Sequence, residues 1–291
     1  DGIGGTGNSL IKPNNGNVTP YANSDAGAKI AVSTNNANVY SDFTFSFTPP
    51  TPDSLQVTAN LQDGSGASVD TQITPHDGGI GMFANSPELG LLAFYPFNSD
   101  ANDISGNGNN GTVNGATLTN NRFSIPNKAY NFDGSTADIQ VSDSASLRPS
   151  AVSVQVWMKS TTVGGYLVSK SLNGGWSSYA IYASSGNLAF HIGNSAFFNV
   201  SPFASANVWD GNWHHIVGTY DGTTIRLYED GVEVGTGTPD NRILDYSTDP
   251  LTIGNYQPTA SYHFNGDLDD VRIYDRALTP SEITALYTVT Q

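Results

Sequence analysis

The chain has 291 residues, 11% of them aromatic and 13% charged, with a formal net charge of −15. The aromatic content excludes a globally disordered chain, and 11 lysines and arginines are too few to neutralise the phosphates of a nucleic-acid partner. The lack of cysteine excludes disulfides and thiolate metal sites. No apolar run approaches the roughly 20 residues of a membrane span, and no signal peptide is visible, so we expect a mature form if the protein is secreted.

The composition of the acidic residues indicates an all-β protein. Only Glu88, Glu229, Glu233 and Glu282 are glutamates among the 26 acidic residues, and the others are aspartates. Aspartate serves turns and caps, whereas glutamate is common in helices. We therefore expect a chain that is rich in turns and poor in helix.

Residues 1–88 are expected to form an arm followed by a small immunoglobulin-like β module. The arm, up to about Ser24, is rich in glycine and asparagine and has no apolar periodicity. Strands are predicted next at 28–32, 43–47, 55–61 and 68–73. A linker and a domain boundary are expected near Glu88.

Residues 89–291 are expected to form a larger antiparallel sandwich, because long aromatic strands follow one another with hardly any helix. Asp230-Gly231 predicts a two-residue hairpin with a type I′ turn. Thr279, Pro280 and Glu282 predict one C-terminal helix with a capping box, docked through Ile283, Leu286 and Tyr287.

Several motifs in this second part resemble the bacterial laminin-G-like, concanavalin A-like jelly rolls over roughly residues 89–288. They are the segments 90–98, 102–112 and 129–134, Trp213-His-His-Ile-Val217, Leu227-Tyr-Glu-Asp-Gly231, 266–274 and 277–283. The resemblance implies a two-sheet jelly-roll sandwich. It implies no activity, because this fold carries hydrolases, lectins and adhesion modules.

An enzyme is the least favoured class on sequence grounds. The compact acidic group at Glu229, Asp230 and Glu233 is expected at an exposed hairpin tip, where its side chains cannot line a cleft. A Gly-x-Ser-x-Gly nucleophile elbow is missing from the sequence. His214 and His215 point to opposite faces of a strand and cannot bind one metal.

Calcium is the favoured ion. Asparagines and aspartates crowd a glycine-rich loop at 98–110, and calcium binds hard oxygen ligands at flexible spacing. From the loop we expect Asp103, Asn107 and Asn110 as ligands, and the resemblance adds Asp269 from the last strand. The alternative is that the asparagines serve turns and that Asp269 or Asp270 pairs with Arg272 or Arg276.

A glycan site is expected at the rim of the sandwich, because sugars stack on exposed aromatic faces. Trp176 and Trp209 lie in predicted loops and would form a platform with Tyr262 and His263. Each tryptophan equally fits a role capping the core, and for Trp209 this is the favoured interpretation. Trp157 and Trp213 are expected in the core.

The favoured function is a secreted or cell-surface, non-catalytic adhesion protein that binds a polysaccharide or cell-surface glycan. The alternative is a structural subunit of an extracellular filament or surface assembly, in which the arm at 1–24 joins other copies of the chain by strand addition. A polysaccharide-active enzyme comes third.

Overall fold

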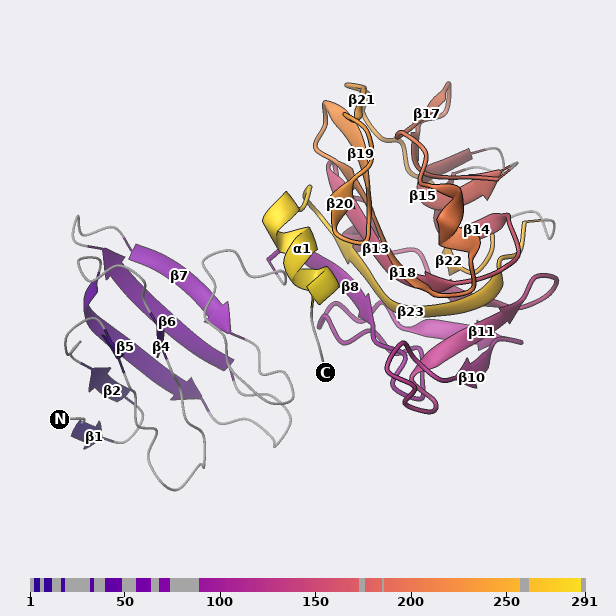
Figure 1. The fold of residues 1–291 in the computed structure, drawn as a ribbon. Helices are drawn as coiled ribbons and strands as arrows, with labels where there is room; N and C mark the ends of the chain where they lie inside the picture. The colour runs from indigo at the N-terminus through magenta and orange to yellow at the C-terminus, as the bar shows by residue number, and fades with distance from the viewer. Residues whose placement is uncertain are drawn as a thin grey trace. The chain divides into compact units, whose positions relative to one another are not determined.

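The computed structural model describes residues 89–172, 176–184, 186–256 and 262–288, together with the backbone of seven strands within 1–88. Contacts divide the chain into two units, Asp1–Ser86 and Pro87–Gln291 (Figure 1). In the described part, no helix is long and apolar enough to cross a membrane.

The first unit contains an antiparallel sheet in the order β1-β2-β5-β6-β7 and a separate pair, β3-β4. These strands are β1 (Ile3–Gly5), β2 (Asn8–Ile11), β3 (Asn17–Val18), β4 (Val32–Ser33), β5 (Tyr40–Thr48), β6 (Gln56–Asp63) and β7 (Ser68–Ile73). Strands β5 to β7 fall where the sequence predicts strands. β1 and β2 fall inside the expected arm, and β2 pairs with β5 of the same chain, so a role of the arm in joining subunits stays a prediction.

The second unit is a sandwich of two antiparallel sheets, which confirms the predicted jelly roll. The first sheet has the order β10-β11-β23-β13-β18-β19-β20, with β8 beside β23 and β21 beside β19. Its strands are β8 (Leu91–Tyr95), β10 (Thr117–Thr119), β11 (Ala129–Asp133), β13 (Val152–Lys159), β18 (Trp213–Tyr220), β19 (Thr224–Glu229), β20 (Val232–Glu233), β21 (Thr238–Pro239) and β23 (Asn265–Tyr274).

The second sheet has the order β17-β16-β15-β14-β22-β12-β9. Its strands are β9 (Gly111–Asn114), β12 (Asp138–Val141), β14 (Gly165–Leu172), β15 (Trp176–Ser184), β16 (Asn187–Gly193), β17 (Phe198–Val200) and β22 (Leu251–Ile253). Two short 3-10 helices, η1 (Ala145–Leu147) and η2 (Ala206–Trp209), lie in the connections.

The core lies between the sheets, and the period-two alternation of each strand decides which side chains enter it. On β15, Tyr179, Ile181 and Ala183 belong to the buried cluster, as do Ile216 and Tyr220 on β18. The side chains between them therefore point to the outer faces of the two sheets.

The helix α1 (Pro280–Thr288) covers part of the outer face of the first sheet (Figure 1). The predicted capping box is present: the Thr279 backbone N–H donates to Glu282 at 2.7 Å and the Glu282 N–H donates to Thr279 Oγ1 at 3.3 Å. Ile283 and Leu286 are buried against this sheet, as predicted. The ring of Tyr287 stacks on Trp157, which is buried on this outer face.

Candidate functional site

A row of aromatic rings crosses the outer face of the second sheet. The rings, called the aromatic row below, come from β14 to β17 and from the residues on either side of 257–261: Tyr166, Tyr182, His191, Phe198, Tyr256 and Tyr262. Neighbouring rings have centroids 4.9 to 5.8 Å apart. Tyr166 and Tyr182 stack at 5.1 Å, and His191 stacks on Phe198 at 5.0 Å with the ring planes 3° apart.

Strand pairing and alternation place these rings in line. Tyr166 of β14 lies directly opposite Tyr182 of β15, so the two side chains share a face. His191 of β16 is diagonal to Tyr182, whose direct partner is Ala189. Because Tyr179, Ile181 and Phe190 fill the core, Tyr182 and His191 must point outward.

The row is open in the middle and at both ends. Tyr262 is 51% exposed and Phe198 is 42% exposed, while Tyr166 and Tyr182 are half-buried. His191 and Tyr256 are buried beneath these neighbours. The accessible rings therefore offer aromatic faces and edges to a ligand, with the buried rings as support.

The polar atoms of the row are uncharged near neutral pH. Burial raises the pKa of the Tyr166 hydroxyl, with a contribution from neighbouring tyrosines, and burial also raises the pKa of Tyr182. Burial lowers the pKa of His191 to about 4, although its hydrogen bond to the Ser177 carbonyl opposes the shift. The row therefore presents neutral hydroxyl groups to a ligand.

The four residues expected to bind glycan have different surroundings. Tyr262 lies in the aromatic row, and His263 beside it hydrogen-bonds through Nδ1 to the Ala137 carbonyl at 3.2 Å. Trp209, on η2, is buried in the core, which corrects its expected place in an exposed platform. Trp176 is the first residue of β15 rather than part of a loop, and its side chain lies outside the described residues.

Tyr166 and Tyr182 were not predicted as site residues. The residues around each tyrosine predict a strand, but a strand pattern alone does not show which face of the sheet is covered by other parts of the protein. The signal that could have found them is a tyrosine on each of two consecutive strands, in each case next to residues that point into the core. The two rings then point outward on the same face.

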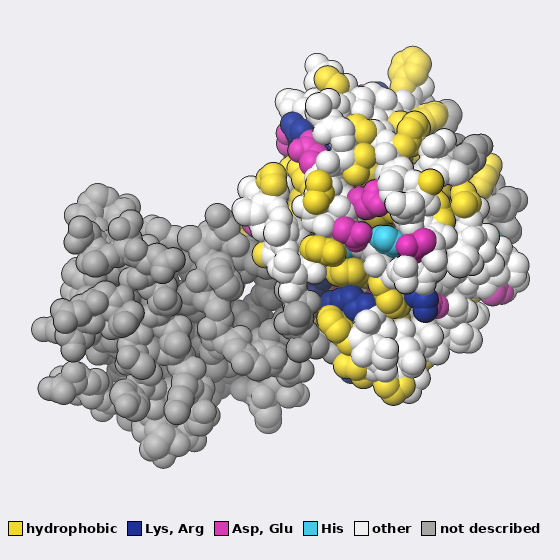
Figure 2. All heavy atoms as spheres, in the orientation of Figure 1, with side chains coloured by type: hydrophobic (Ala, Val, Ile, Leu, Met, Phe, Trp, Pro, Cys, Tyr) yellow, Lys and Arg dark blue, Asp and Glu magenta, His cyan; other side chains and the backbone are white. Residues whose placement is uncertain are grey.

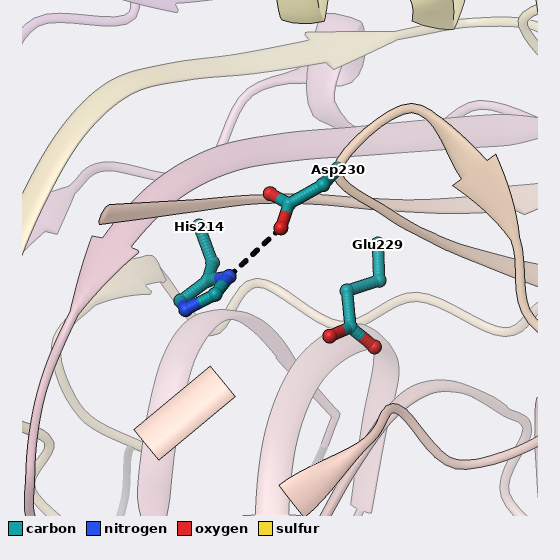
Figure 3. A group of neighbouring side chains, drawn as sticks. All are labelled: His214, Glu229 and Asp230. Atoms are coloured by element: carbon teal, nitrogen blue, oxygen red, sulfur yellow. Dashed lines mark hydrogen bonds and ion pairs between the residues drawn. The ribbon is translucent and has the colours of Figure 1, made fainter. Parts of the chain in front are cut away.

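A second cluster lies where β18 begins and β19 turns into β20 (Figure 3). Among the described residues, it is the group in which three possible metal ligands come together: His214, Glu229 and Asp230 lie with one ligand atom each within 4.8 Å of one another. Figure 2 shows a histidine at the surface with acidic side chains beside it.

These side chains already have hydrogen-bond partners within the same chain. His214 Nδ1 lies 2.9 Å from Asp230, and its Nε2 lies 3.2 Å from Asp210. The Glu229 carboxylate accepts hydrogen bonds from the backbone N–H and the hydroxyl of Ser205. These hydrogen bonds therefore connect η2 and the β19–β20 hairpin to the start of β18.

The predicted hairpin turn is confirmed, because Asp230 and Gly231 have φ angles of 51° and 81°. The expectation that Glu229 and Asp230 stand at an exposed tip is wrong. Both carboxylates fold back onto Ser205, His214 and the His215 backbone N–H, and both are half-buried.

The loop expected to bind calcium is closed by its own hydrogen bonds. The Asp103 carboxylate accepts four of them, each at 2.9 Å, from the backbone N–H of Phe94, Ser105 and Asn109 and from the Ser105 hydroxyl. Asn110 Oδ1 accepts from the Asp103 N–H, and Asn107 donates its amide to the carbonyls of Leu91 and Leu92. The side-chain oxygens of Asp103 and Asn110 therefore have protein donors, and the Asn107 side chain is held through its amide nitrogen.

Asp269 has a different partner. It is buried on β23 and lies 3.2 Å from the Arg122 guanidinium, which also contacts Asp270 at 2.6 Å. Burial and the adjacent Asp270 carboxylate raise the pKa of Asp269. Asp270 also lies 3.7 Å from Arg272, as the alternative expected, whereas the partner of Asp269 is Arg122, which was not among the expected arginines. Calcium binding by the protein stays a prediction.

A family model described as the concanavalin A-like lectin/glucanases superfamily matches residues 133–284. The chain belongs to this superfamily. No curated protein sequence matches the chain.

Solved structures share the superfamily fold. The binding domain of Paraclostridial Mosquitocidal Protein 1 has a TM-score of 0.56 and 20% identity, over 69% of this chain and 52% of that one. Domain 4 of AbnA, a GH43 extracellular arabinanase from Geobacillus stearothermophilus in complex with arabinotriose, has a TM-score of 0.54 and 22% identity, over 68% and 98%.

The binding domain of botulinum neurotoxin DC in complex with SialylT has a TM-score of 0.53 and 13% identity, over 69% of this chain and 52% of that one. This chain thus spans about half the length of the toxin binding domains it matches. At these identities the likeness shows the fold alone.

We predict that Asp103→Asn lowers the free energy of unfolding by about 1–3 kcal/mol, because an amide group would face backbone N–H donors that need an acceptor. Urea denaturation measures the change, with Asp100→Asn as the control, since Asp100 is exposed in the same loop. The loss should be equal in calcium and in chelator. A loss seen only with calcium present would instead support the calcium site.

We predict that the contribution of His214 to stability decreases as the pH rises. Burial lowers its pKa, but the hydrogen bonds to Asp230 and Asp210 outweigh this effect and raise the pKa above the ordinary value. The stabilisation is therefore complete below about pH 6.5 and is lost as the pH rises through the folded-state pKa.

Urea denaturation of the parent and of His214→Gln tests this at about pH 6 and about pH 9. The difference in unfolding free energy should be larger at the lower pH. Asp210→Asn, which removes one of the two carboxylate partners, should reduce that pH dependence. An equal difference at both pH values would contradict the prediction.

Proposed function

We propose that the sandwich unit is a non-catalytic carbohydrate-binding module that holds a glycan on the aromatic row. The observation that carries the proposal is the continuous line of rings from Tyr262 to Phe198, exposed at both ends. Sugar rings have one apolar face that packs on an aromatic ring and hydroxyl groups that hydrogen-bond to polar side chains. A row of this kind supports a chain of sugars better than a single one.

The exposed aromatic surface supports binding for an energetic reason. Tyr262 and Phe198 leave apolar surface in water, which a folded chain normally avoids where a group of large side chains gathers. Four of the six rings, those of Tyr166, Tyr182, His191 and Phe198, lie on paired strands, so most of the row is held before a ligand arrives. Preorganisation of this kind reduces the entropy lost on binding.

The comparisons support the proposal at the level of the fold. One similar structure is an arabinanase domain in complex with arabinotriose, and others are binding domains of toxins. These describe binding domains of larger extracellular proteins and toxins, which is why we propose an extracellular or surface-bound location here.

The absence of catalysis is part of the proposal. Cleavage of a glycosidic bond requires two carboxyl groups facing the substrate. The half-buried carboxylates of Glu229 and Asp230 hold Ser205 and His214, and neither lies on a strand of the aromatic row. The alternative of an assembly subunit joined through residues 1–24 stays a prediction.

We predict that Tyr262→Ala weakens glycan binding at least about tenfold, because losing about 1.4 kcal/mol of stacking energy has that effect on affinity. Affinity electrophoresis in gels containing soluble polysaccharides measures it. Phe203→Ala is a matched control: both side chains are 51% exposed, but Phe203 has no ring contact with the row among the described residues.

Trp176→Ala tests the glycan role first expected for that residue in the same gels. Equal retention of the parent and the Tyr262→Ala variant would contradict the proposal, as would a parent that migrates freely in every polysaccharide. Unchanged circular dichroism spectra would show that each variant is folded.

A further inference from the structure

From the charge distribution around the aromatic row we infer that its ligand is an uncharged glycan and that sialylated, sulfated or uronic-acid glycans are rejected. This inference rests on the proposed function and names the ligand class of the same surface. It concerns only the sandwich unit.

The segments that carry the row contain almost no charged residues, although the whole chain has a net charge of −15. Residues 165–200 and 251–263 include no aspartate or glutamate, and their one lysine or arginine is Lys170. The undescribed residues inside these segments are Asn, Gly, Ser, Gln, Pro, Thr and Ala, so they add no charge. Apart from Lys170, these segments thus carry no charge of their own, although the carboxylates of Asp240 and Asp245, from another segment, accept hydrogen bonds from Asn199 and Ser195 within them.

Lys170 is not available to a ligand. Its side chain is fully buried, and its ammonium lies 2.9 Å from Asp143 and 3.2 Å from the Ser247 carbonyl, with a further hydrogen bond to the Asp249 carbonyl. Three acceptors satisfy the three donors of an ammonium group. The lysine is therefore part of the structure beneath the surface.

The other basic side chains of the sandwich unit lie outside these segments, although Arg242 is near enough to His191 that its charge adds to burial in lowering the pKa of that ring. Seven of them pair with carboxylates at 3.7 Å or less: Arg122, Arg148, Lys159, Arg226, Arg242, Arg272 and Arg276. Figure 2 shows dark-blue side chains directly beside magenta ones on the face it presents. Lys128 has no ion pair among the described residues, but it precedes β11 in the other sheet.

The imidazoles do not replace a lysine or an arginine. His191 is buried, and burial lowers its pKa to about 4, so the ring is neutral near pH 7. His263 lies beside Tyr262 and is bonded through Nδ1 to a carbonyl.

An anionic sugar would therefore lose hydration at the row without gaining a charged partner. Carboxylates and sulfates are usually bound by arginine or lysine through charge-assisted hydrogen bonds. Here they would meet neutral hydroxyl groups and the repulsion of a strongly acidic protein. A neutral glycan has neither cost, because its hydroxyl groups can pair with tyrosine hydroxyls and its apolar face can stack.

The first test compares the retention of the full chain in gels that contain a neutral arabinan, a neutral galactan or polygalacturonate. The second compares the binding of lactose and of sialyllactose by calorimetry. Measurements are made at about pH 8, in about 20 mM and about 200 mM salt. We expect retention by a neutral polysaccharide and an affinity at least about tenfold lower for polygalacturonate and for sialyllactose. Salt should not weaken the binding of the neutral glycan. Lys128→Gln should behave like the parent.

The outcomes separate the inference from the proposed function. Binding of polygalacturonate or sialyllactose as tightly as a neutral glycan, lost in Tyr262→Ala, would overturn the inference and leave the proposed function standing. Charged-glycan binding lost in Lys128→Gln but kept in Tyr262→Ala would overturn both, because the site would lie elsewhere. No binding of any of these glycans would also overturn both.

Discussion

The contact of Phe190 with Gly218 constrains the arrangement of the two sheets on which the aromatic row depends. A Cβ atom on Gly218 would lie 2.1 Å from the Phe190 ring, so the ring packs directly on the backbone of β18. Both residues are in the middle of their strands, one in each sheet. With Phe190 fixed inward, alternation along β16 turns Ala189 and His191 outward. The register with β15 then aligns Tyr182 and Tyr166 on the same outer face.

The outer faces of the two sheets differ in what covers them. The outer face of the first sheet is covered by α1, which buries Ile283 and Leu286 and stacks Tyr287 over Trp157. The outer face of the second sheet carries the aromatic row, whose end residues are exposed. One sheet thus has a helix of its own chain as cover, whereas rings on the other are accessible. This difference makes the second sheet the better candidate for a binding surface.

Local signals in the sequence were sufficient where a short motif determines the backbone. Asp230-Gly231 predicted the hairpin, and Thr279 with Glu282 predicted the start of α1, because both depend on residues next to each other in the chain. The short strands β9 and β12 were missed, since they pair with each other although β10 and β11 lie between them in the chain. The three-residue strand β17 was missed as well, although it pairs with the preceding strand β16.

The candidate site was predicted only in part for the same reason. Tyr262 was identified as an exposed ring near the rim, but Tyr166 and Tyr182 become neighbours of it only through sheet pairing. Trp209 was misplaced because a loop residue next to glycine can equally turn into the core. The loop at 98–110 has calcium-like composition, yet its oxygens accept backbone hydrogen bonds, which composition does not distinguish from ligation.

The acidic character of the chain and its proposed ligand are linked by where the charges lie. Carboxylates close loops, cap turns and pair with nearly all the arginines and lysines of the sandwich unit, as Asp103, Asp143 and Glu282 illustrate. Apart from Asp138 and Lys170, which are buried in the second sheet, the charged residues of the sandwich unit lie in the connections, on the first sheet and on α1, and the strands of the aromatic row carry no exposed charge. Recognition at this surface would depend on stacking and on neutral hydrogen bonds, and salt should affect it little.

The most direct measurement is nuclear magnetic resonance of the protein with labelled aromatic rings, titrated with a neutral oligosaccharide. The account predicts that the ring signals of Tyr166, Tyr182, Tyr262 and Phe198 shift together, with one dissociation constant, while those of Tyr287 and Trp157 beneath α1 stay unchanged. Shifts confined to the rings near α1 or to the His214 cluster, with the aromatic row unaffected, would contradict it.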